Sequence, residues 1–240
     1  MRHVVAMAVV CGCLAAAVTI ARADVFSFPR AETTSRFYLN GIVGDSFTTL
    51  ASGGVNTAGG GPVANTGAAV DDLLTLGGAL GVAASRPDGE LRLEVESLGR
   101  GTLDGRTKSV FPPEEYVVRA GDAWTVMANL WRERSITDRL GLYAGGGIGA
   151  GGYRIAVDDQ TVSGADADAA FAWQVGAGAT WRLGPRITLD FGYRFLDLGT
   201  MSTPLTLADG AAAGHYDSSL SASEWLLTVR IYEPFAAFRR

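Results

Sequence analysis

The feature that most constrains the fold is a strict alternation of apolar and polar residues between positions 187 and 195. Because successive side chains of a strand leave opposite faces of the sheet, a period of two predicts a β-strand. The positions between the apolar residues are polar or glycine, and they include Asp190 and Arg194. Every second residue is large and apolar, namely Ile187, Leu189, Phe191, Tyr193 and Phe195.

Seven further stretches repeat this alternation. With 187–195 they give eight expected strands, at 36–47, 73–83, 91–96, 123–131, 140–151, 171–182 and 224–232. Strands of roughly nine to twelve residues match the length that crosses a bilayer at a tilt. The connections between them alternate long and short, which is typical of long external loops and short periplasmic turns with both termini in the periplasm. Backbone groups in lipid must all be paired, so such a sheet has to close on itself.

We therefore predict an all-β domain over residues 36–235, an eight-stranded antiparallel up-and-down transmembrane β-barrel with four long external loops. The alternative is a soluble barrel of the lipocalin type, which is apolar inside and polar outside. The opposite polarity of this chain favours the membrane barrel, because its charged strand residues fall opposite the apolar row. Five aromatic residues of that row are predicted to lie at the lipid interface, namely Trp124, Trp173, Trp181, Tyr193 and Trp225.

Residues 1–23 have the layout of a cleaved secretory signal peptide. A short basic start with Arg2 precedes an almost wholly apolar run, Val4 to Ile20. Ala21-Arg22-Ala23 then supplies small residues one and three positions before a cut at Asp24. The alternatives are a retained transmembrane helix and a lipoprotein leader. The sequence therefore predicts export of the chain.

Both cysteines, Cys11 and Cys13, lie in this leader, so the mature chain would contain no disulfide. Removing Arg2 and Arg22 leaves 18 basic and 25 acidic residues, a formal charge of −7. That charge disfavours nucleic acid as a partner. Residues 24–35 are expected to form a periplasmic N-terminal tail.

Seven charged strand residues are expected to form a polar network in the lumen. An eight-stranded barrel is just wide enough inside for its own side chains, so these groups should meet. One hypothesis is a proton or ion path. The favoured one is a set of ion pairs that fills the barrel and fixes its register, since buried charges must be paired. Inward glycines on three strands would leave room for the arginines. The seven residues are Arg92, Glu94, Glu96, Arg182, Asp190, Arg194 and Arg230.

Four segments give the chain a family resemblance. They are Gly192-Tyr193-Arg194-Phe195 continuing to Leu198-Gly199, Leu91-Arg92-Leu93-Glu94, Met127-Ala128-Asn129-Leu130, and Tyr143-Ala144-Gly145-Gly146-Gly147-Ile148-Gly149. In this order and spacing the chain, over roughly residues 36 to 235, resembles the outer-membrane β-barrel family. The similar members are the small one-domain barrels related to the OmpA transmembrane domain and the opacity-type surface proteins. The opacity-type resemblance implies adhesion through the loops.

The C-terminus departs from the family pattern. Members usually end on an aromatic residue that the barrel-assembly machinery reads, whereas this chain continues past Phe235 and Phe238 to a tail at 236–240. Either phenylalanine is a candidate for that signal. Pro234 cannot donate a hydrogen bond to the ladder, so the last strand is expected to end near Tyr232.

The connections contain little that predicts chemistry. His215 is the single histidine outside the leader, and it is expected in a Gly/Ala-rich external loop without a fixed nucleophile beside it. The Ala51–Gly67 stretch, rich in glycine, serine and asparagine, is expected to be flexible, with no packed structure of its own. The connection after residue 151 is expected to be a solvated acidic loop, and it lacks EF-hand spacing for Ca²⁺ although it contains Asp158, Asp159, Asp166 and Asp168.

These features predict a non-enzymatic protein of the outer membrane with no catalytic residues, no metal and no cofactor. The expected roles are envelope integrity and adhesion or partner contact through surface loops. Expected partners are outer-membrane lipid and lipopolysaccharide, the assembly machinery, and host or envelope surface components. The alternatives are a narrow passive pore and, as a less favoured one, a lipid A-modifying barrel enzyme.

Overall fold

The computed structural model describes residues 34–50, 54–57, 62–65, 69–101, 103–108, 115–158, 162–207 and 212–234. The predicted leader, the C-terminal tail and both candidate assembly aromatics lie outside these residues. Within this part of the chain all regular elements are strands, and no helix there is long and apolar enough to cross a membrane.

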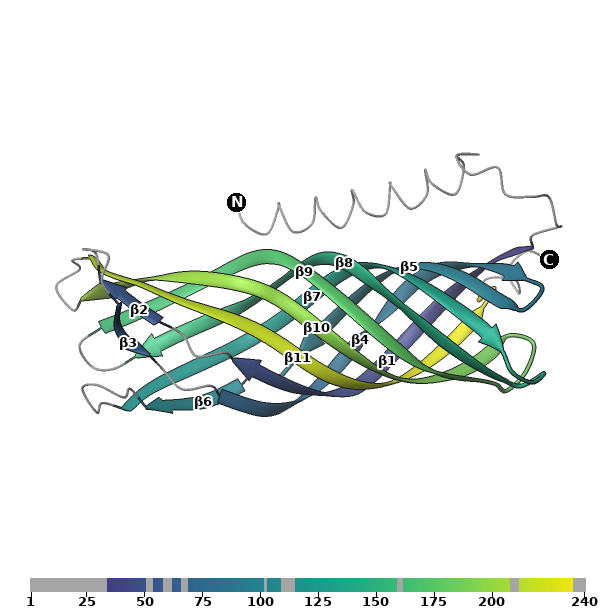
Figure 1. Ribbon diagram of the computed structural model, residues 1–240, viewed down its shortest axis with the longest axis horizontal. Helices are drawn as coiled ribbons and strands as arrows, with labels where there is room; N and C mark the ends of the chain where they lie inside the picture. Colours follow the sequence, from purple (N-terminus) through teal and green to yellow (C-terminus); the bar gives the residue numbers. More distant parts are fainter. Residues whose placement is uncertain are drawn as a thin grey trace, which may run out of the picture.

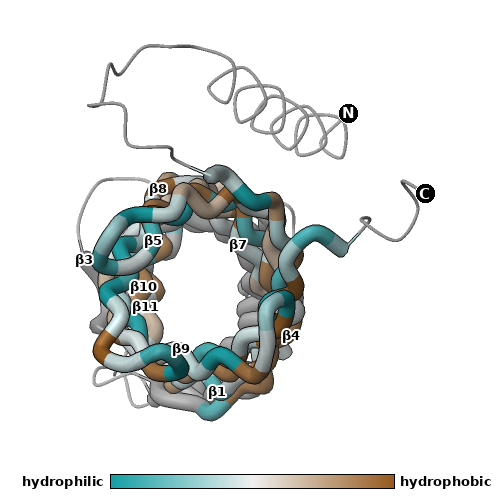
Figure 2. Tube along the Cα trace, turned by 90° about the vertical axis from the view of Figure 1, so that its right-hand side faces the viewer, coloured by the Kyte–Doolittle hydropathy of each residue, from teal (hydrophilic) through white to brown (hydrophobic). Residues whose placement is uncertain are grey.

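Eight long strands form a closed antiparallel barrel (Figures 1 and 2), which confirms the predicted fold class. Around the ring the order is β1-β4-β5-β7-β8-β9-β10-β11, and β11 pairs with β1 to complete it. The strands are β1 (Ser35–Leu50), β4 (Ala69–Arg86), β5 (Gly89–Arg100), β7 (Glu115–Ser135), β8 (Leu140–Asp158), β9 (Val162–Arg182), β10 (Ile187–Leu207) and β11 (Ala212–Tyr232).

The three short connections lie together at one end of the barrel, the end that also holds the start of β1 and the end of β11 (Figure 1). The β4–β5 hairpin is the tightest: Arg86 pairs with Gly89, so only two residues remain in the turn, and Gly89 takes a positive φ of 147°. β11 ends at Tyr232, which confirms the expected stop before Pro234. We call this end of the barrel the short-turn end.

Most strands run well past their expected ends, away from the short turns. β8 continues to Asp158 and β9 begins at Val162, so the predicted acidic loop is largely strand, and Asp166 and Asp168 belong to β9. The expected external loop around His215 is also strand, because this residue lies in β11. The physical reason is that beyond the bilayer both faces of a strand can meet water, so no alternation is required there.

Three short strands at this far end complete the sheet (Figure 1). β2 (Gly54–Thr57) pairs with β11, and β3 (Pro62–Asn65) pairs with β2. β6 (Leu103–Lys108) pairs with β7. The prediction that the Ala51–Gly67 stretch forms no structure of its own was therefore wrong. The extended part of β11 offers unpaired backbone groups along its edge, and a glycine-rich segment can satisfy them as readily as any other.

The ladder between β9 and β10 is interrupted above the membrane-spanning part. The paired positions pass from Asp197–Trp173 directly to Thr206–Ser163. Gly199 lies at the start of this gap with φ of 70°, and its N–H donates to Asp197 Oδ1 at 2.8 Å. Over this interval β9 remains paired with β8, and β10 remains paired with β11.

The outer wall of the barrel carries an apolar band. On β10 this band runs from Ile187 to Phe195, and the outward side chains alternate with buried inward ones throughout. A stretch of this length matches the ~9–11 residues that a tilted strand needs to cross the hydrocarbon core. β10 then continues for a further stretch, which at a rise of about 3.3 Å per residue and a tilt near 45° projects on the order of 25 Å beyond the bilayer.

Inward glycines accommodate side chains of neighbouring strands, and these are more often aromatic or aliphatic than the arginines expected. A Cβ on Gly81 would overlap the ring of Tyr38, and one on Gly192 would overlap the hydroxyl of Tyr143. Gly176 does face an arginine, since its Cβ would lie 2.8 Å from Arg194 Cβ.

Gly145→Val tests this packing. The new side chain would overlap the Leu130 carbonyl and the Trp131 ring, and backbone cannot move aside as a flexible side chain can. We expect a loss of about 1–3 kcal/mol in the free energy of unfolding, measured by urea titration of the barrel in phospholipid vesicles. Gly41→Val is the matched control, because no atom lies within 4 Å of its Cβ. Equal effects of the two substitutions would contradict the packing argument.

Candidate functional site

The lumen holds a layered network of charged side chains. Of the seven residues predicted to face it, six are nearly inaccessible, and Arg182 lies at the short-turn rim with 28% of its side chain exposed. Alternation along each strand is what turns them inward, since their sequence neighbours form the outer wall. The six are Arg92, Glu94, Glu96, Asp190, Arg194 and Arg230.

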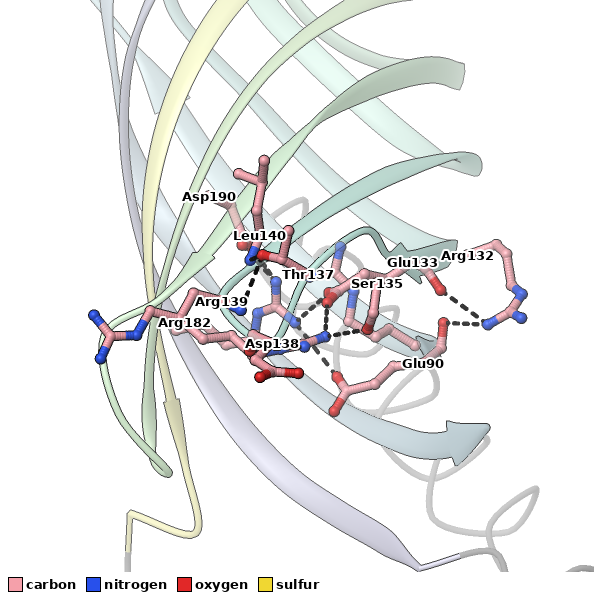
Figure 3. A network of polar contacts seen from close by, with 12 residues as sticks. Glu90, Arg132, Glu133, Ser135, Thr137, Asp138, Arg139, Leu140, Arg182 and Asp190 are labelled. Atoms are coloured by element: carbon pink, nitrogen blue, oxygen red, sulfur yellow. Dashed lines mark hydrogen bonds and ion pairs between the residues drawn. The ribbon is translucent and has the colours of Figure 1, made fainter. Parts of the chain in front are cut away.

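Arg230 is the centre of the layer nearest the short turns. Its Nη2 donates to Asp190 at 2.5 Å, and its Nη1 donates to Glu133 Oε2 at 3.3 Å and to the Tyr232 hydroxyl at 2.7 Å. The Tyr232 hydroxyl in turn donates to Glu90 at 2.6 Å. Figure 3 shows part of this region, with Arg182 donating to Glu133 at 2.7 Å. Arg230 thus connects carboxylates from three different strands.

Two carboxylates of this layer face each other directly. Glu90 on β5 and Glu133 on β7 are register partners, and like charges in such a position repel. Arg230 contacts both of them, at 3.6 Å and 3.3 Å. Arg36 adds a contact to Glu90 at 2.6 Å, and Arg182 one to Glu133 at 2.7 Å. The pairing of β5 with β7 at this level therefore depends on arginines from other strands.

A second layer lies farther from the short turns and is centred on Arg194. This arginine donates to Glu96 Oε1 at 2.7 Å and, through Nε, to its register partner Glu224 at 2.5 Å. Arg100 also reaches Glu224, at 2.6 Å, and donates to Thr125 at 3.2 Å. The contact between Arg194 and Glu96 crosses the lumen, because β5 and β10 are four strands apart in either direction around the ring.

Between the two layers Glu94 accepts hydrogen bonds from uncharged donors. Its Oε1 accepts from Trp131 Nε1 at 2.7 Å and from Asn129 at 3.3 Å. Its Oε2 accepts from the Tyr38 hydroxyl at 2.9 Å and from Asn40 at 3.0 Å. Four donors on one carboxylate allow it to be buried at 5% exposure without a direct ion pair.

The network is balanced in charge, although the sequence predicted only part of it. Among the described residues it contains six arginines and six carboxylates. The predicted set lacked Arg36, Glu90, Arg100, Glu133 and Glu224. Strand alternation is the signal that could have found them, because Arg100 and Glu133 continue the inward rows of Glu96 and Trp131 past the expected strand ends.

Little open volume remains in this part of the lumen. The cavity lined by Arg92, Glu94, Asp190 and Arg194 has a volume of ≈ 40 Å³, enough for one or two water molecules but not for an aqueous channel. Beyond the Arg194 layer the buried inward side chains are mostly apolar, and Thr48, Thr125 and Arg100 lie among them. The apolar ones are each 7% exposed or less, and they are Leu73, Leu98, Ala123, Ala172, Leu196, Leu198, Leu220 and Ala222.

Four of the five predicted interface aromatics are exposed on the outer wall, and Trp124 is half-buried. Trp225 stacks on Phe191 with ring centroids 5.5 Å apart and contacts Tyr193 at 5.0 Å. Trp181 lies at the short-turn end of the wall, where it pairs in register with Leu140. Their depth relative to the lipid headgroups stays a prediction.

The described residues contain no group of three or more histidine, cysteine or acidic side chains arranged to hold a metal ion. His215 is exposed, and its register partners are Pro204 and Asn56. The chemistry that this geometry supports is therefore mutual neutralisation of charges inside a narrow barrel.

Comparison with known proteins identifies the family to which this barrel belongs. The outer membrane protein beta-barrel domain matches residues 6–230. The chain belongs to this family, and the membrane that it crosses is accordingly the outer membrane. No curated protein matches the chain.

Several solved outer-membrane barrels are similar in fold. The outer membrane protease OmpT from Escherichia coli is 10% identical, with a TM-score of 0.50 over 85% of this chain and 99% of OmpT. Neisserial surface protein A is 15% identical, with a TM-score of 0.41 over 82% of this chain and 98% of that one. The attachment invasion locus protein Ail of Yersinia pestis is 14% identical, with a TM-score of 0.40 over 81% and 97%. At these identities the likeness concerns the fold alone.

Arg230→Met tests whether the network stabilises the barrel. Asp190, Glu133 and Glu90 would lose their shared cation in a buried site, which should cost about 3–5 kcal/mol. The measurement is urea unfolding in vesicles, followed by tryptophan fluorescence. Arg182→Met is the control, because its partly exposed pair should be worth about 0–1 kcal/mol. Equal losses in the two variants would refute a central role for Arg230.

Proposed function

We propose that the protein is a non-enzymatic outer-membrane barrel that serves the envelope structurally and makes contacts beyond the membrane through its long-strand end. The observation that carries this proposal is the lumen, in which the buried charged groups contact one another or, for Glu94, uncharged donors. Such groups are neither exposed to a substrate nor arranged along an open path.

The strand extensions support the contact role. β7, β8, β9, β10 and β11 continue far beyond the apolar band, and β2, β3 and β6 widen the sheet there. A barrel that only filled the bilayer would need about half of this strand length. The extra length presents a broad surface at a distance from the lipid, which favours contact with host or envelope surface components. Lipopolysaccharide and the barrel-assembly machinery remain proposed partners.

A passive pore is the main competing function, and conductance distinguishes it. In planar bilayers we expect no single-channel steps from the wild-type barrel, because the ≈ 40 Å³ cavity does not provide a continuous water path. A quadruple variant that removes two ion pairs, Glu96→Ala/Arg194→Ala together with Asp190→Ala/Arg230→Ala, should show single-channel steps. Asp88→Ala/Arg132→Ala, which removes an exposed pair, should not. A wild-type barrel that conducts as well as the opened variant would establish the pore instead.

The contact role is tested by shortening one extension. Residues 199–219 are replaced with an Asn-Gly turn. Leu198 and Leu220 then flank a two-residue hairpin, one residue beyond the pair that Asp197 of β10 forms with Ser221 of β11. Cells producing this variant should attach to an epithelial monolayer no better than cells lacking the protein, whereas their resistance to vancomycin should equal that of wild-type cells. Unchanged attachment would refute the contact role, and lost vancomycin resistance would refute its separation from the structural role.

A further inference from the structure

The exposed charges at the short-turn end are predominantly basic. Four arginines there are exposed, namely Arg132, Arg134, Arg139 and Arg186, against two exposed carboxylates, Asp88 and Asp138. Toward the other side of the apolar band the exposed charges on described side chains are acidic, with Asp45 on β1 and Asp72 on β4. Among the side chains that the structure describes, the two rims of the band therefore differ in sign.

One of these arginines is already engaged. Arg132 pairs with Asp88 and donates to the carbonyls of Glu90 and Glu133 at 3.1 Å and 2.9 Å. The hydrogen bond that Arg132 donates to the Asp88 carboxylate is the main cause that lowers the pKa of Asp88 from its ordinary value. The remaining three, Arg134, Arg139 and Arg186, form no ion pair with another described residue.

These three arginines, which we call the arginine rim, adjoin the lower edge of the apolar wall. Arg134 points outward on β7 beside its register partner Leu142, which is 53% exposed. Arg139 directly precedes Leu140 in the β7–β8 turn, and Arg186 directly precedes Ile187 in the β9–β10 turn. β8 and β9 are neighbours, so the rim follows one continuous arc of the barrel.

Exposed apolar residues lie within the same turns. Ile136 and Leu183 are each 55% exposed at turn positions, and Trp181 is 56% exposed just above them. Exposed apolar side chains that lie together, rimmed by charged ones, point to an interaction site. Apolar side chains beside arginines are typical of the membrane interface, where the apolar part enters the acyl region and the charge stays among the headgroups.

We propose that the arginine rim binds the phosphate groups of anionic phospholipids in the leaflet that faces the periplasm. A guanidinium matches a phosphate with two parallel hydrogen bonds, and each basic residue near an anionic surface adds attraction. The orientation with short turns in the periplasm places the rim in that leaflet. Phosphatidylglycerol is the headgroup class that this chemistry selects over zwitterionic phosphatidylethanolamine.

Lipid titration followed by native mass spectrometry tests this site on the full-length folded barrel. Arg134→Gln/Arg139→Gln/Arg186→Gln should weaken phosphatidylglycerol binding by roughly 10- to 100-fold, and should leave phosphatidylethanolamine binding unchanged. The matched control is Arg106→Gln/Arg119→Gln/Arg154→Gln, which removes the same charge from β6, β7 and β8 at the other end and should bind as wild type does.

If the rim variant folds, three results would overturn the proposal. Equal weakening in both triple variants would assign the effect to net charge, and competition by soluble glycerol phosphate as strong as that by the lipid would assign it to a free phosphate. Binding of wild type, but not of the rim variant, to isolated peptidoglycan with no difference in lipid binding would assign the rim to that polymer. If the rim variant fails to fold, the wild-type preference for phosphatidylglycerol must fall with rising salt; a salt-independent preference would refute the site.

Discussion

Closure of the sheet in lipid is the constraint on which the rest of this structure depends. Every backbone N–H and C=O group in the hydrocarbon must be paired, and only the β1–β11 pairing leaves no edge there. Once eight strands close, the lumen is narrow and inward charges cannot avoid one another. They are tolerable only as a balanced set, and contacts such as Arg194–Glu96 connect opposite walls of the ring. Ring closure thus determines both the outer apolar band and the inner ion network.

Alternation within the bilayer made much of this predictable from sequence. Because one face of each strand meets lipid and the other meets a charged lumen, apolar and polar side chains must alternate along it. The strand around Asp190 and Arg194 therefore identified both faces. The same rule placed Arg92, Glu94 and Glu96 inside. It did not reveal that Glu94 would be satisfied by uncharged donors from two other strands, β1 and β7, because this depends on the register between strands and not on the pattern within one.

Prediction from sequence failed for the parts of the strands that lie beyond the apolar band. Past the apolar band water can reach both faces of a strand, and segments such as 162–168 carry small and acidic residues without a row of large apolar ones. These segments resemble loops, yet their backbones continue the ladders of neighbouring strands. Arg100 and Glu133 were missed for a different reason: they continue the inward rows of Glu96 and Trp131, but they lie just beyond the expected strand ends. Pairing between distant segments, such as β2 with β11, leaves no trace in local composition.

The two halves of the barrel therefore obey different physical rules. In the membrane the ion layers connect opposite walls, so strand register there is costly to change. Above Asp197 the β9–β10 ladder is interrupted, so β9 there pairs with β8 and β10 pairs with β11, while β6 and β2 add short pairings to β7 and β11. Substitutions that preserve these backbone pairings should be tolerated in that half, because no lipid surrounds the strands there. A surface with this freedom can change its contacts without endangering the barrel that supports it, which is the property that a contact surface outside the membrane requires.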